Sequence, residues 1–96
     1  MALTKTLSKE LGSSSIRVNA VLIGLIQSGQ WERRAQAQGV ATTTYYADLA
    51  RGAQVPLGRV GRAEEFSDLV CYLLSDRSSY MSGTAINLDG GLSSVV

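Results

Sequence analysis

The sequence predicts an α/β fold in which two parallel strands are connected through an amphipathic helix. An apolar segment ends at residue 23 without alternation of polar and apolar side chains, which is typical of strands covered on both faces. A strong helix pattern follows at residues 63–74, and a second strand-like segment at residues 84–88. This order indicates a βαβ crossover with additional residues inserted before its helix.

The chain begins with a pattern typical of a short amphipathic helix over residues 1–11. Leu3, Leu7 and Leu11 recur at helical spacing with polar residues on the other face, and Gly12 ends the pattern. No Ser, Asp or Asn precedes the first turn as a cap. We therefore interpret the segment as the end of a longer helix.

Residues 16–23 are predicted to form the first strand, with an apolar second half. Asn19 lies inside this segment, and a buried amide must find hydrogen-bond partners. We expect Asn19 to have a structural role, with its side-chain amide hydrogen-bonded within the fold. Two parallel strands alone would leave an apolar strand with an unpaired edge, so half of the packing is expected to be missing.

Residues 24–54 carry a weaker pattern, and we interpret them as a lid. Residues 30–38 are compatible with a polar helix, Gly39 interrupts the pattern, and Thr42 could cap a second short helix.

The aromatic and basic side chains of the lid allow two interpretations each. Trp31, Tyr45 and Tyr46 either wall a substrate pocket or pack within the lid itself. Arg33 and Arg34 either reach an anionic group or form a solvated helix face, which is the commoner role of an exposed pair.

The clearest helix pattern covers residues 63–74. Turn residues around Pro56 precede it, and Glu64 and Glu65 suit the positive end of a helix dipole. Cys71 lies beside the apolar stripe without a neighbouring cation, so we expect a lightly buried, unreactive thiol. The stripe consists of Phe66, Leu69, Val70, Leu73 and Leu74.

The second strand is predicted at residues 84–88, and Asp89-Gly90-Gly91 ends it. Asp89 could act as an acid or a base, but no titratable partner lies near it in the sequence. We expect Asp89 to fix the turn by accepting backbone hydrogen bonds.

Composition excludes several classes of protein. A chain of 96 residues with 45% hydrophobic and 18% charged residues predicts one packed domain at most. The formal net charge of +1 comes from scattered charges, so we expect no nucleic-acid partner. One cysteine and no histidine argue against an intrachain disulfide or a metal site. Neither a membrane span nor a signal peptide is recognisable, which makes the cytoplasm the default location.

Several segments together resemble the C-terminal portion of the short-chain dehydrogenase/reductase family. The resemblance covers essentially the whole chain, and it depends on the order and spacing of the segments. They are Leu7-Ser8-Lys9-Glu10, Ile16-Arg17-Val18-Asn19-Ala20-Val21, Val55-Pro56-Leu57-Gly58-Arg59-Val60-Gly61 with Glu64-Glu65, Ser79-Tyr80-Met81-Ser82-Gly83, and Asp89-Gly90-Gly91.

The resemblance implies a Rossmann-type doubly wound parallel sheet, of which this chain supplies the last two strands with the lid and helices. The family's glycine-rich cofactor turn and its Ser, Tyr and Lys active site would precede Met1. We therefore expect the N-terminal half of the domain to be missing and no catalytic residue to lie in this chain.

The resemblance also assigns a candidate cofactor-binding loop. The family sequence Pro-Gly-x-Ile-x-Thr clasps the nicotinamide carboxamide of NAD or NADP, and here it aligns with residues 23–28. The expected contacts are Ile23, Gly24, Ile26 and Ser28, with Ile23 in place of the proline and Ser28 in place of the threonine. The alternative is an ordinary turn from a strand into a loop.

By resemblance, the parent protein is an NAD(P)-dependent oxidoreductase that transfers a hydride between nicotinamide and a small carbonyl or alcohol substrate. This chain would supply the nicotinamide-side loop, the lid and an oligomer interface, and alone it should be inactive. Its expected partners are further copies of the chain in a homo-oligomer or the missing N-terminal part. The alternative is a truncated, non-catalytic packing module.

Overall fold

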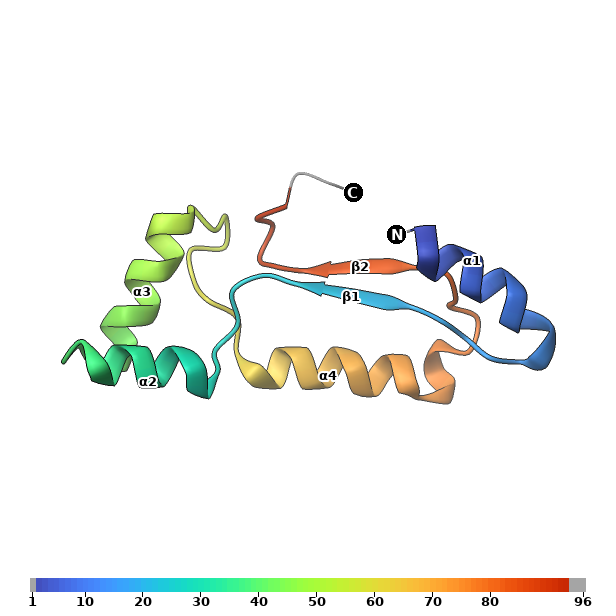
Figure 1. The fold of residues 1–96 in the computed structure, drawn as a ribbon, viewed down its shortest axis with the longest axis horizontal. Coiled ribbons are helices and arrows are strands. Elements are labelled where there is room, and N and C mark those ends of the chain that lie inside the picture. Colours follow the sequence, from blue (N-terminus) through green and yellow to red (C-terminus); the bar gives the residue numbers. More distant parts are fainter. Residues whose placement is uncertain (1, 94–96) are drawn as a thin grey trace.

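The computed structural model describes residues 2–93, which form two strands, four α-helices and two short 3-10 helices (Figure 1). In chain order these are α1 (Ala2–Leu11), η1 (Gly12–Ser14), β1 (Ala20–Ile23), α2 (Gly29–Ala37), α3 (Thr42–Ala53), α4 (Ala63–Leu74), η2 (Asp76–Ser78) and β2 (Ala85–Leu88).

The two strands form a parallel sheet, as the crossover pattern predicts. Ala20 lies opposite Ala85, and the pairing continues without a break to Ile23 opposite Leu88. The first strand is shorter than the predicted residues 16–23, because β2 begins only at Ala85. Before that point Gly83 has a φ of +74° and its N–H bonds to the Val18 carbonyl at 2.7 Å. The chain therefore enters the sheet through a turn.

Asn19 ties the start of β1 to the approach of β2. Its Nδ2 donates to the Met81 carbonyl at 3.0 Å, and its Oδ1 accepts the Thr84 N–H at 3.1 Å. Both hydrogen-bonding ends of the amide are used between segments far apart in the sequence. The predicted structural role of Asn19 is confirmed.

Helix α4 covers residues 63–74, the same range that its apolar spacing predicts, and runs alongside the strands (Figure 1). Leu73 is its buried residue. The expectation of a lightly buried Cys71 is wrong, because the thiol lies on the exposed side of the helix. Its position beside the stripe, rather than within it, leaves the thiol open to solvent.

Arg17 joins the segment before β1 to the C-terminal end of α4. Its Nη2 donates to the carbonyls of Leu73 at 2.9 Å and Ser75 at 3.3 Å, and its Nη1 donates to the carbonyl of Ser78 at 3.0 Å. The last carbonyls of a helix have no partner within the helix and carry partial negative charge. A planar guanidinium satisfies several of them at once.

The lid consists of α2 and α3, which pack against each other. Thr42, the predicted cap, is instead the first helical residue of α3, and Ala41 occupies the cap position without a side-chain bond. A core cluster joins α3 to the segment that follows it. Its buried members are Tyr46, Ala50, Val55 and Val60, with Leu25, Trp31, Leu49 and Ala53 packed against them.

The chain is elongated, with principal extents of 53 × 24 × 20 Å. Its radius of gyration is 16.4 Å, against about 12 Å for a compact domain of this length. The accessible surface of 6785 Å² also exceeds the roughly 5,300 Å² expected for a compact monomer of this mass. Neither strand contains a fully buried residue.

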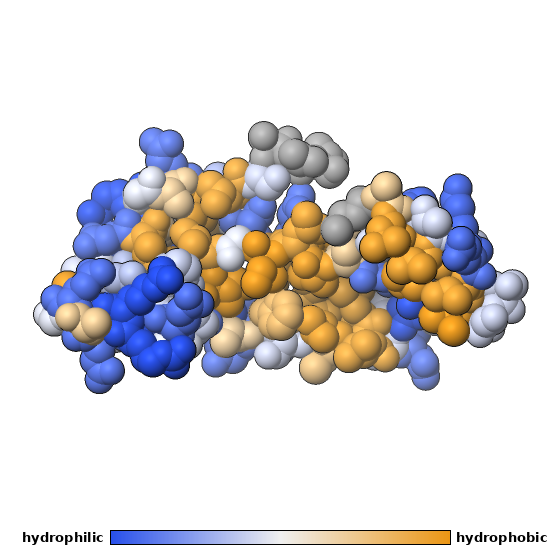
Figure 2. Space-filling model, viewed as in Figure 1, coloured by the Kyte–Doolittle hydropathy of each residue, from blue (hydrophilic) through white to orange (hydrophobic). Residues whose placement is uncertain are grey.

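Hydrophobic residues gather on the surface over the middle of the molecule, where Figure 1 places β1, β2 and α4 (Figure 2). Strongly polar residues cover α2 in the same view. Among residues 2–93, no helix combines the length and apolar character needed to cross a membrane.

Candidate functional site

The predicted cofactor-binding loop lies beyond the carboxyl end of β1. Ile23 is the last residue of the strand, pairs with Leu88, and is 57% exposed. The next N–H, that of Gly24, donates to the Leu88 carbonyl at 3.0 Å. In open α/β sheets, ligands bind outside the carboxyl ends of the strands. The loop therefore lies where the fold class places ligands.

Gly24 passes close to the turn that follows β2. A Cβ atom at this position would lie 2.8 Å from the Cβ and 3.0 Å from the Cα of Asp89, so only glycine fits without displacement. Asp89 itself accepts hydrogen bonds from the N–H groups of Gly91 at 3.0 Å and Ser93 at 2.9 Å. The expectation that Asp89 fixes the turn is confirmed, and the close approach of Gly24 sets the distance between the two loops.

Ile26 forms an isolated parallel bridge with Gly61. The Gly61 N–H donates to the Leu25 carbonyl at 2.9 Å, and the Gln27 N–H donates to the Gly61 carbonyl at 2.8 Å. In this parallel pattern the flanking residues make the bonds, so the N–H and C=O of Ile26 point to the opposite edge. Within residues 2–93 neither group has a hydrogen-bond partner. One residue thus presents a free donor and a free acceptor side by side.

This pair of groups matches one class of ligand. A primary carboxamide carries a carbonyl acceptor and an NH₂ donor on the same carbon. The N–H of Ile26 complements the first and its C=O complements the second. The donor set therefore fits the carboxamide of nicotinamide, which is the group that the resemblance assigns to this loop.

Ser28 stands at the cap position of α2 but does not cap it. No side-chain cap bond is made, although serine is one of the preferred N-cap residues. Instead its backbone is held by the buried Tyr46, whose hydroxyl accepts the Ser28 N–H at 3.1 Å and donates to the Ser28 carbonyl at 3.2 Å. The Ser28 hydroxyl has no partner among the described residues.

A small cavity of about 80 Å³ lies behind the loop. Ligand pockets usually have volumes of about 300–1,000 Å³, so this cavity has room only for a few water molecules. Ile26 is half-buried and lines this cavity, whereas Ser28 is exposed. The cavity is lined by Leu25, Ile26, Leu57, Arg59, Gly61, Glu65, Leu88, Asp89 and Gly90.

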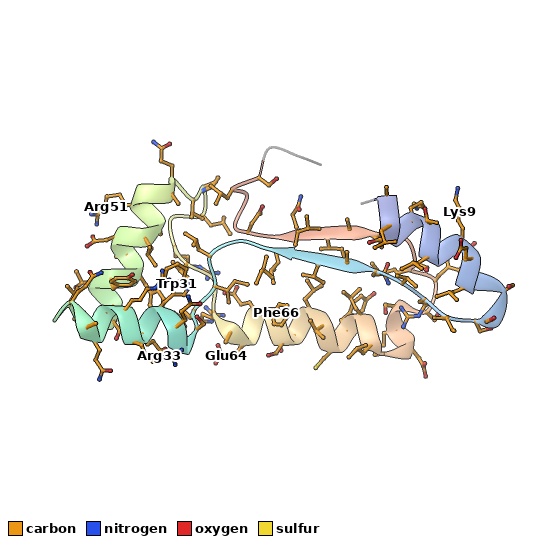
Figure 3. All side chains as sticks on the ribbon, viewed as in Figure 1. Lys9, Trp31, Arg33, Arg51, Glu64 and Phe66 are labelled. Carbon is orange, nitrogen blue, oxygen red and sulfur yellow. The ribbon has the colours of Figure 1, made fainter. Side chains whose placement is uncertain are left out.

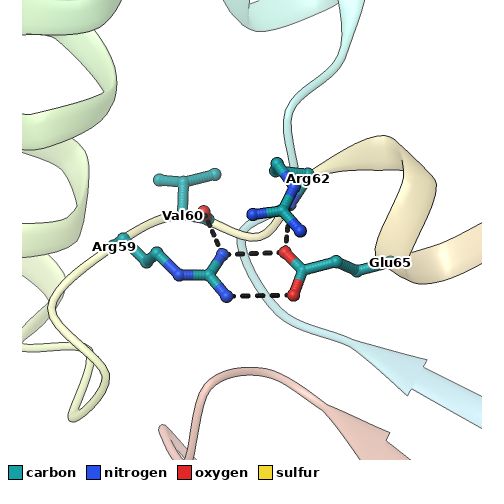
Figure 4. Close-up of polar contacts among 4 residues, drawn as sticks. All are labelled: Arg59, Val60, Arg62 and Glu65. Atoms are coloured by element: carbon teal, nitrogen blue, oxygen red, sulfur yellow. Dashed lines mark hydrogen bonds and ion pairs between the residues drawn. The ribbon is translucent and has the colours of Figure 1, made fainter.

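An ion pair fixes the turn that supports Ile26 (Figure 4). Two N–H groups of Arg59 donate to the Glu65 carboxylate at 2.7 and 2.9 Å, and the Arg62 backbone N–H donates to the same carboxylate at 2.8 Å. Gly61, the partner of Ile26, lies between these two arginines. The sequence pattern predicted Glu65 at the start of the helix, but it did not indicate Arg59 as the ion-pair partner of Glu65.

The ion pair changes the acidity of both groups. Hydrogen bonds from Arg59 and the Arg62 backbone lower the pKa of Glu65 to about 2, and the positive charges nearby act in the same direction. The hydrogen bond and the negative charge of Glu65 raise the pKa of Arg59. The pair is therefore charged throughout the neutral range. It lies on the surface, so water and salt screen much of its strength.

The lid aromatics form a row beside the loop. The ring centroids of Trp31 and Tyr45 lie 6.5 Å apart, as do those of Tyr45 and Tyr46, and the Arg34 guanidinium lies 4.9 Å from the Trp31 centroid. Trp31 lies between α2 and α3, whereas Arg33 points outward (Figure 3). Trp31 and Tyr46 belong to the lid's own packing.

An open groove of about 440 Å³ lies on the lid beside Tyr45. Its apolar lining includes Leu25, Val40 and Leu49. Of the two roles predicted for Tyr45, forming the wall of a substrate pocket is therefore still open.

The loop has no means of catalysing proton transfer. Residues 24–28 contain no titratable side chain, and the described residues contain no group of three or more His, Cys, Asp or Glu side chains that could hold a metal ion. The loop can bind and orient a ligand through backbone groups and one hydroxyl.

Comparison with known proteins assigns the chain to a family. The family model described as Enoyl-(Acyl carrier protein) reductase matches residues 1–93. A 3-oxoacyl-(acyl-carrier-protein) reductase FabG of Thermotoga maritima is 38% identical over 92 residues, which are 96% of this chain and 34% of that protein. The sorbitol-6-phosphate 2-dehydrogenase of Klebsiella pneumoniae is 37% identical over 93 residues, covering 92% of this chain and 35% of that protein.

Solved structures give the same assignment. An NADPH-bound short-chain oxidoreductase from Pseudomonas aeruginosa PAO1 with an atypical catalytic centre superposes with a TM-score of 0.87 at 39% identity, covering 99% of this chain and 36% of that one. L-sorbose reductase from Gluconobacter frateurii, in complex with NADPH and L-sorbose, superposes with a TM-score of 0.82 at 28% identity. The chain spans about a third of the length of these relatives. It belongs to the short-chain dehydrogenase/reductase family.

Proposed function

We propose that this chain forms the nicotinamide-side part of an NAD(P)-dependent oxidoreductase with a Rossmann-type sheet. The observation that carries the proposal is the free N–H and C=O of Ile26 at the carboxyl end of β1. Family membership and the NADPH complexes among the similar structures support it.

Four residues would hold the nicotinamide end of the cofactor. Ile26 would donate its N–H to the carboxamide oxygen and accept the amide N–H with its carbonyl, and Ser28 would add a hydroxyl contact. Gly24 keeps the loop against Asp89, and Ile23 offers an exposed apolar side chain beside it. When bound, the nicotinamide supplies or accepts the hydride.

The chemistry on the substrate would need further groups. The loop holds the cofactor but moves no proton, so we propose that the isolated chain is inactive and works together with the rest of a family domain. By their names, the relatives act on substrates as different as 3-oxoacyl-(acyl-carrier-protein), sorbitol 6-phosphate and L-sorbose. The proposed substrate class is therefore no narrower than a small carbonyl compound or alcohol.

The uncovered sheet supports an assembly role. Both strands are exposed or half-buried, and apolar side chains such as Ile23 and Leu22 are open to solvent. We propose that these faces are covered in the working protein by further copies of the chain or by the N-terminal part of the domain. The same surface favours the second candidate function, that of a packing module without catalysis.

Titration of the 96-residue chain with nicotinamide mononucleotide, followed by amide NMR, tests the proposal. We expect saturable shifts at Ile26 and Ser28. Nicotinic acid mononucleotide is the matched control, because its carboxylate lacks the N–H donors that the Ile26 carbonyl needs. AMP is a second control that lacks the nicotinamide.

The result separates the two candidate functions. Preferential binding of the carboxamide at residues 24–28 supports the cofactor role. Equal responses to both mononucleotides, or no response at this loop, would contradict the cofactor role. The packing module would then be the favoured function.

A further inference from the structure

Tyr46 connects the lid to the candidate cofactor loop through one hydroxyl. This hydroxyl accepts the Ser28 N–H and donates to the Ser28 carbonyl, at 3.1 and 3.2 Å. It thus makes the two bonds that a neighbouring strand would make to an extended residue. Ser28 has φ −156° and ψ 162°, which is fully extended backbone.

The ring of Tyr46 is a rigid support for these bonds. It is 8% exposed, belongs to the core cluster with Ala50, Val55 and Val60, and packs edge-on against Tyr45. A buried tyrosine hydroxyl needs a partner, and here the partner is the backbone of one loop residue. The position of Ser28 is therefore fixed relative to α3.

The same contact leaves the Ser28 hydroxyl available. A serine at an N-cap usually turns its oxygen to the backbone of its own helix. Here that bond is not made, and the Ser28 carbonyl accepts hydrogen bonds from Tyr46 and from the Glu32 N–H at 3.2 Å. The backbone of Ser28 is satisfied by the lid and the helix, while its side chain stays uncommitted among residues 2–93.

We propose that Tyr46 is a positioning residue that holds the Ser28 hydroxyl in place for the nicotinamide carboxamide. This inference rests on the proposed function and adds to it a residue of the lid. Because the contact joins two elements, docking of α3 and binding at the loop are linked, and each strengthens the other by the same factor.

The test compares Tyr46→Phe with the wild-type chain. This substitution keeps the ring in the core cluster and removes only the hydroxyl. We expect the affinity for nicotinamide mononucleotide to fall about five-fold, as for the loss of one or two hydrogen bonds. Tyr80→Phe is the matched control, because its ring is exposed and its hydroxyl has no partner within residues 2–93, and it should bind like the wild type.

A double-mutant cycle separates positioning from a general structural role. In a Ser28→Ala background, Tyr46→Phe should cost less than about two-fold, since the hydroxyl that it positions is already absent. An equal loss in both backgrounds would show that Tyr46 only stabilises the lid, and would overturn the inference.

Amide hydrogen exchange provides a readout without ligand. Tyr46→Phe should speed exchange at the Ser28 amide about ten-fold while leaving the Ala50 and Val55 amides unchanged. An unchanged Ser28 amide would overturn the inference. A wild-type chain that does not bind the mononucleotide contradicts the proposed function, whereas binding that Tyr46→Phe leaves unaltered contradicts this inference alone.

Discussion

The lid and the sheet bury their apolar residues very differently. Among the described residues, the buried hydrophobic side chains are Ala35, Tyr46, Ala50, Val55, Val60 and Leu73. All except Leu73 lie in the lid or in the segment that follows it. The strands, which usually form the centre of an α/β domain, have no buried residue.

This contrast shows that the two regions are stabilised by different interactions. The lid is covered by its own side chains and places Ser28 from that small core. The sheet region depends on polar ties, namely Arg17 to the end of α4 and Asn19 to the approach of β2. The candidate site lies where the two regions meet, so its geometry depends on both.

The largest expected effect on stability comes from removing the hydrogen bonds of Arg17 in the sheet region. Arg17→Ala leaves the carbonyls of Leu73, Ser75 and Ser78 without their charged donor and should lower the free energy of unfolding by about 3 kcal/mol. Urea unfolding followed by circular dichroism measures this loss.

The control for this change is Arg77→Ala, which removes an exposed guanidinium and should cost less than about 0.5 kcal/mol. Similar losses for the two variants would show that the sheet region does not depend on the Arg17 contacts.

The next largest effect is the difference in lost stability between truncating a buried and truncating an exposed apolar side chain. Val60→Ala, in the lid cluster at 5% exposure, should cost about 2 kcal/mol, whereas Ile23→Ala, at 57% exposure in β1, should cost less than about 0.5 kcal/mol. The same unfolding measurement at low protein concentration compares them. An Ile23→Ala cost equal to that of Val60→Ala would mean that the strand is covered in solution.

The smallest expected effect is the acid sensitivity of the turn that supports Ile26. The pKa of Glu65 is lowered to about 2, so its pairing with Arg59 stabilises the fold fully above about pH 4.5 and is lost as the pH falls toward 2. Glu65→Gln should flatten the dependence of the melting temperature on pH in this range.

Glu64→Gln, one residue earlier on the same helix turn, is the control for this charge change and should keep the wild-type slope. A wild-type slope in Glu65→Gln would assign the acid response to another carboxylate.

Local patterns predicted the parts of the fold that depend on near neighbours. The helix at residues 63–74 was predicted to the residue from its apolar spacing, although Leu73 alone of that stripe is buried. The start of β1 was wrong, since a strand begins where its partner begins, and that partner lies more than sixty residues away in the chain. Thr42 was predicted as the N-cap of α3 but is its first helical residue, because a cap is defined by backbone angles that local sequence does not determine.

The candidate site was only partly predictable for the same reason. The resemblance assigned Ile23, Gly24, Ile26 and Ser28 to the cofactor; in the structure Ile23 ends β1 and the other three follow it. That the N–H and C=O of Ile26 are free depends on the bridge to Gly61, a distant residue. The bond from Tyr46 to Ser28 depends on how the lid packs, and no local pattern signals it.

Residue-resolved hydrogen exchange of the wild-type chain tests most directly whether the lid is self-supporting and the sheet is not. We expect the slowest amides in α3 and at Val55, and much faster exchange at Val21 and Ile86 in the strands. Slowest exchange in β1 and β2, with a rapidly exchanging lid, would contradict the account.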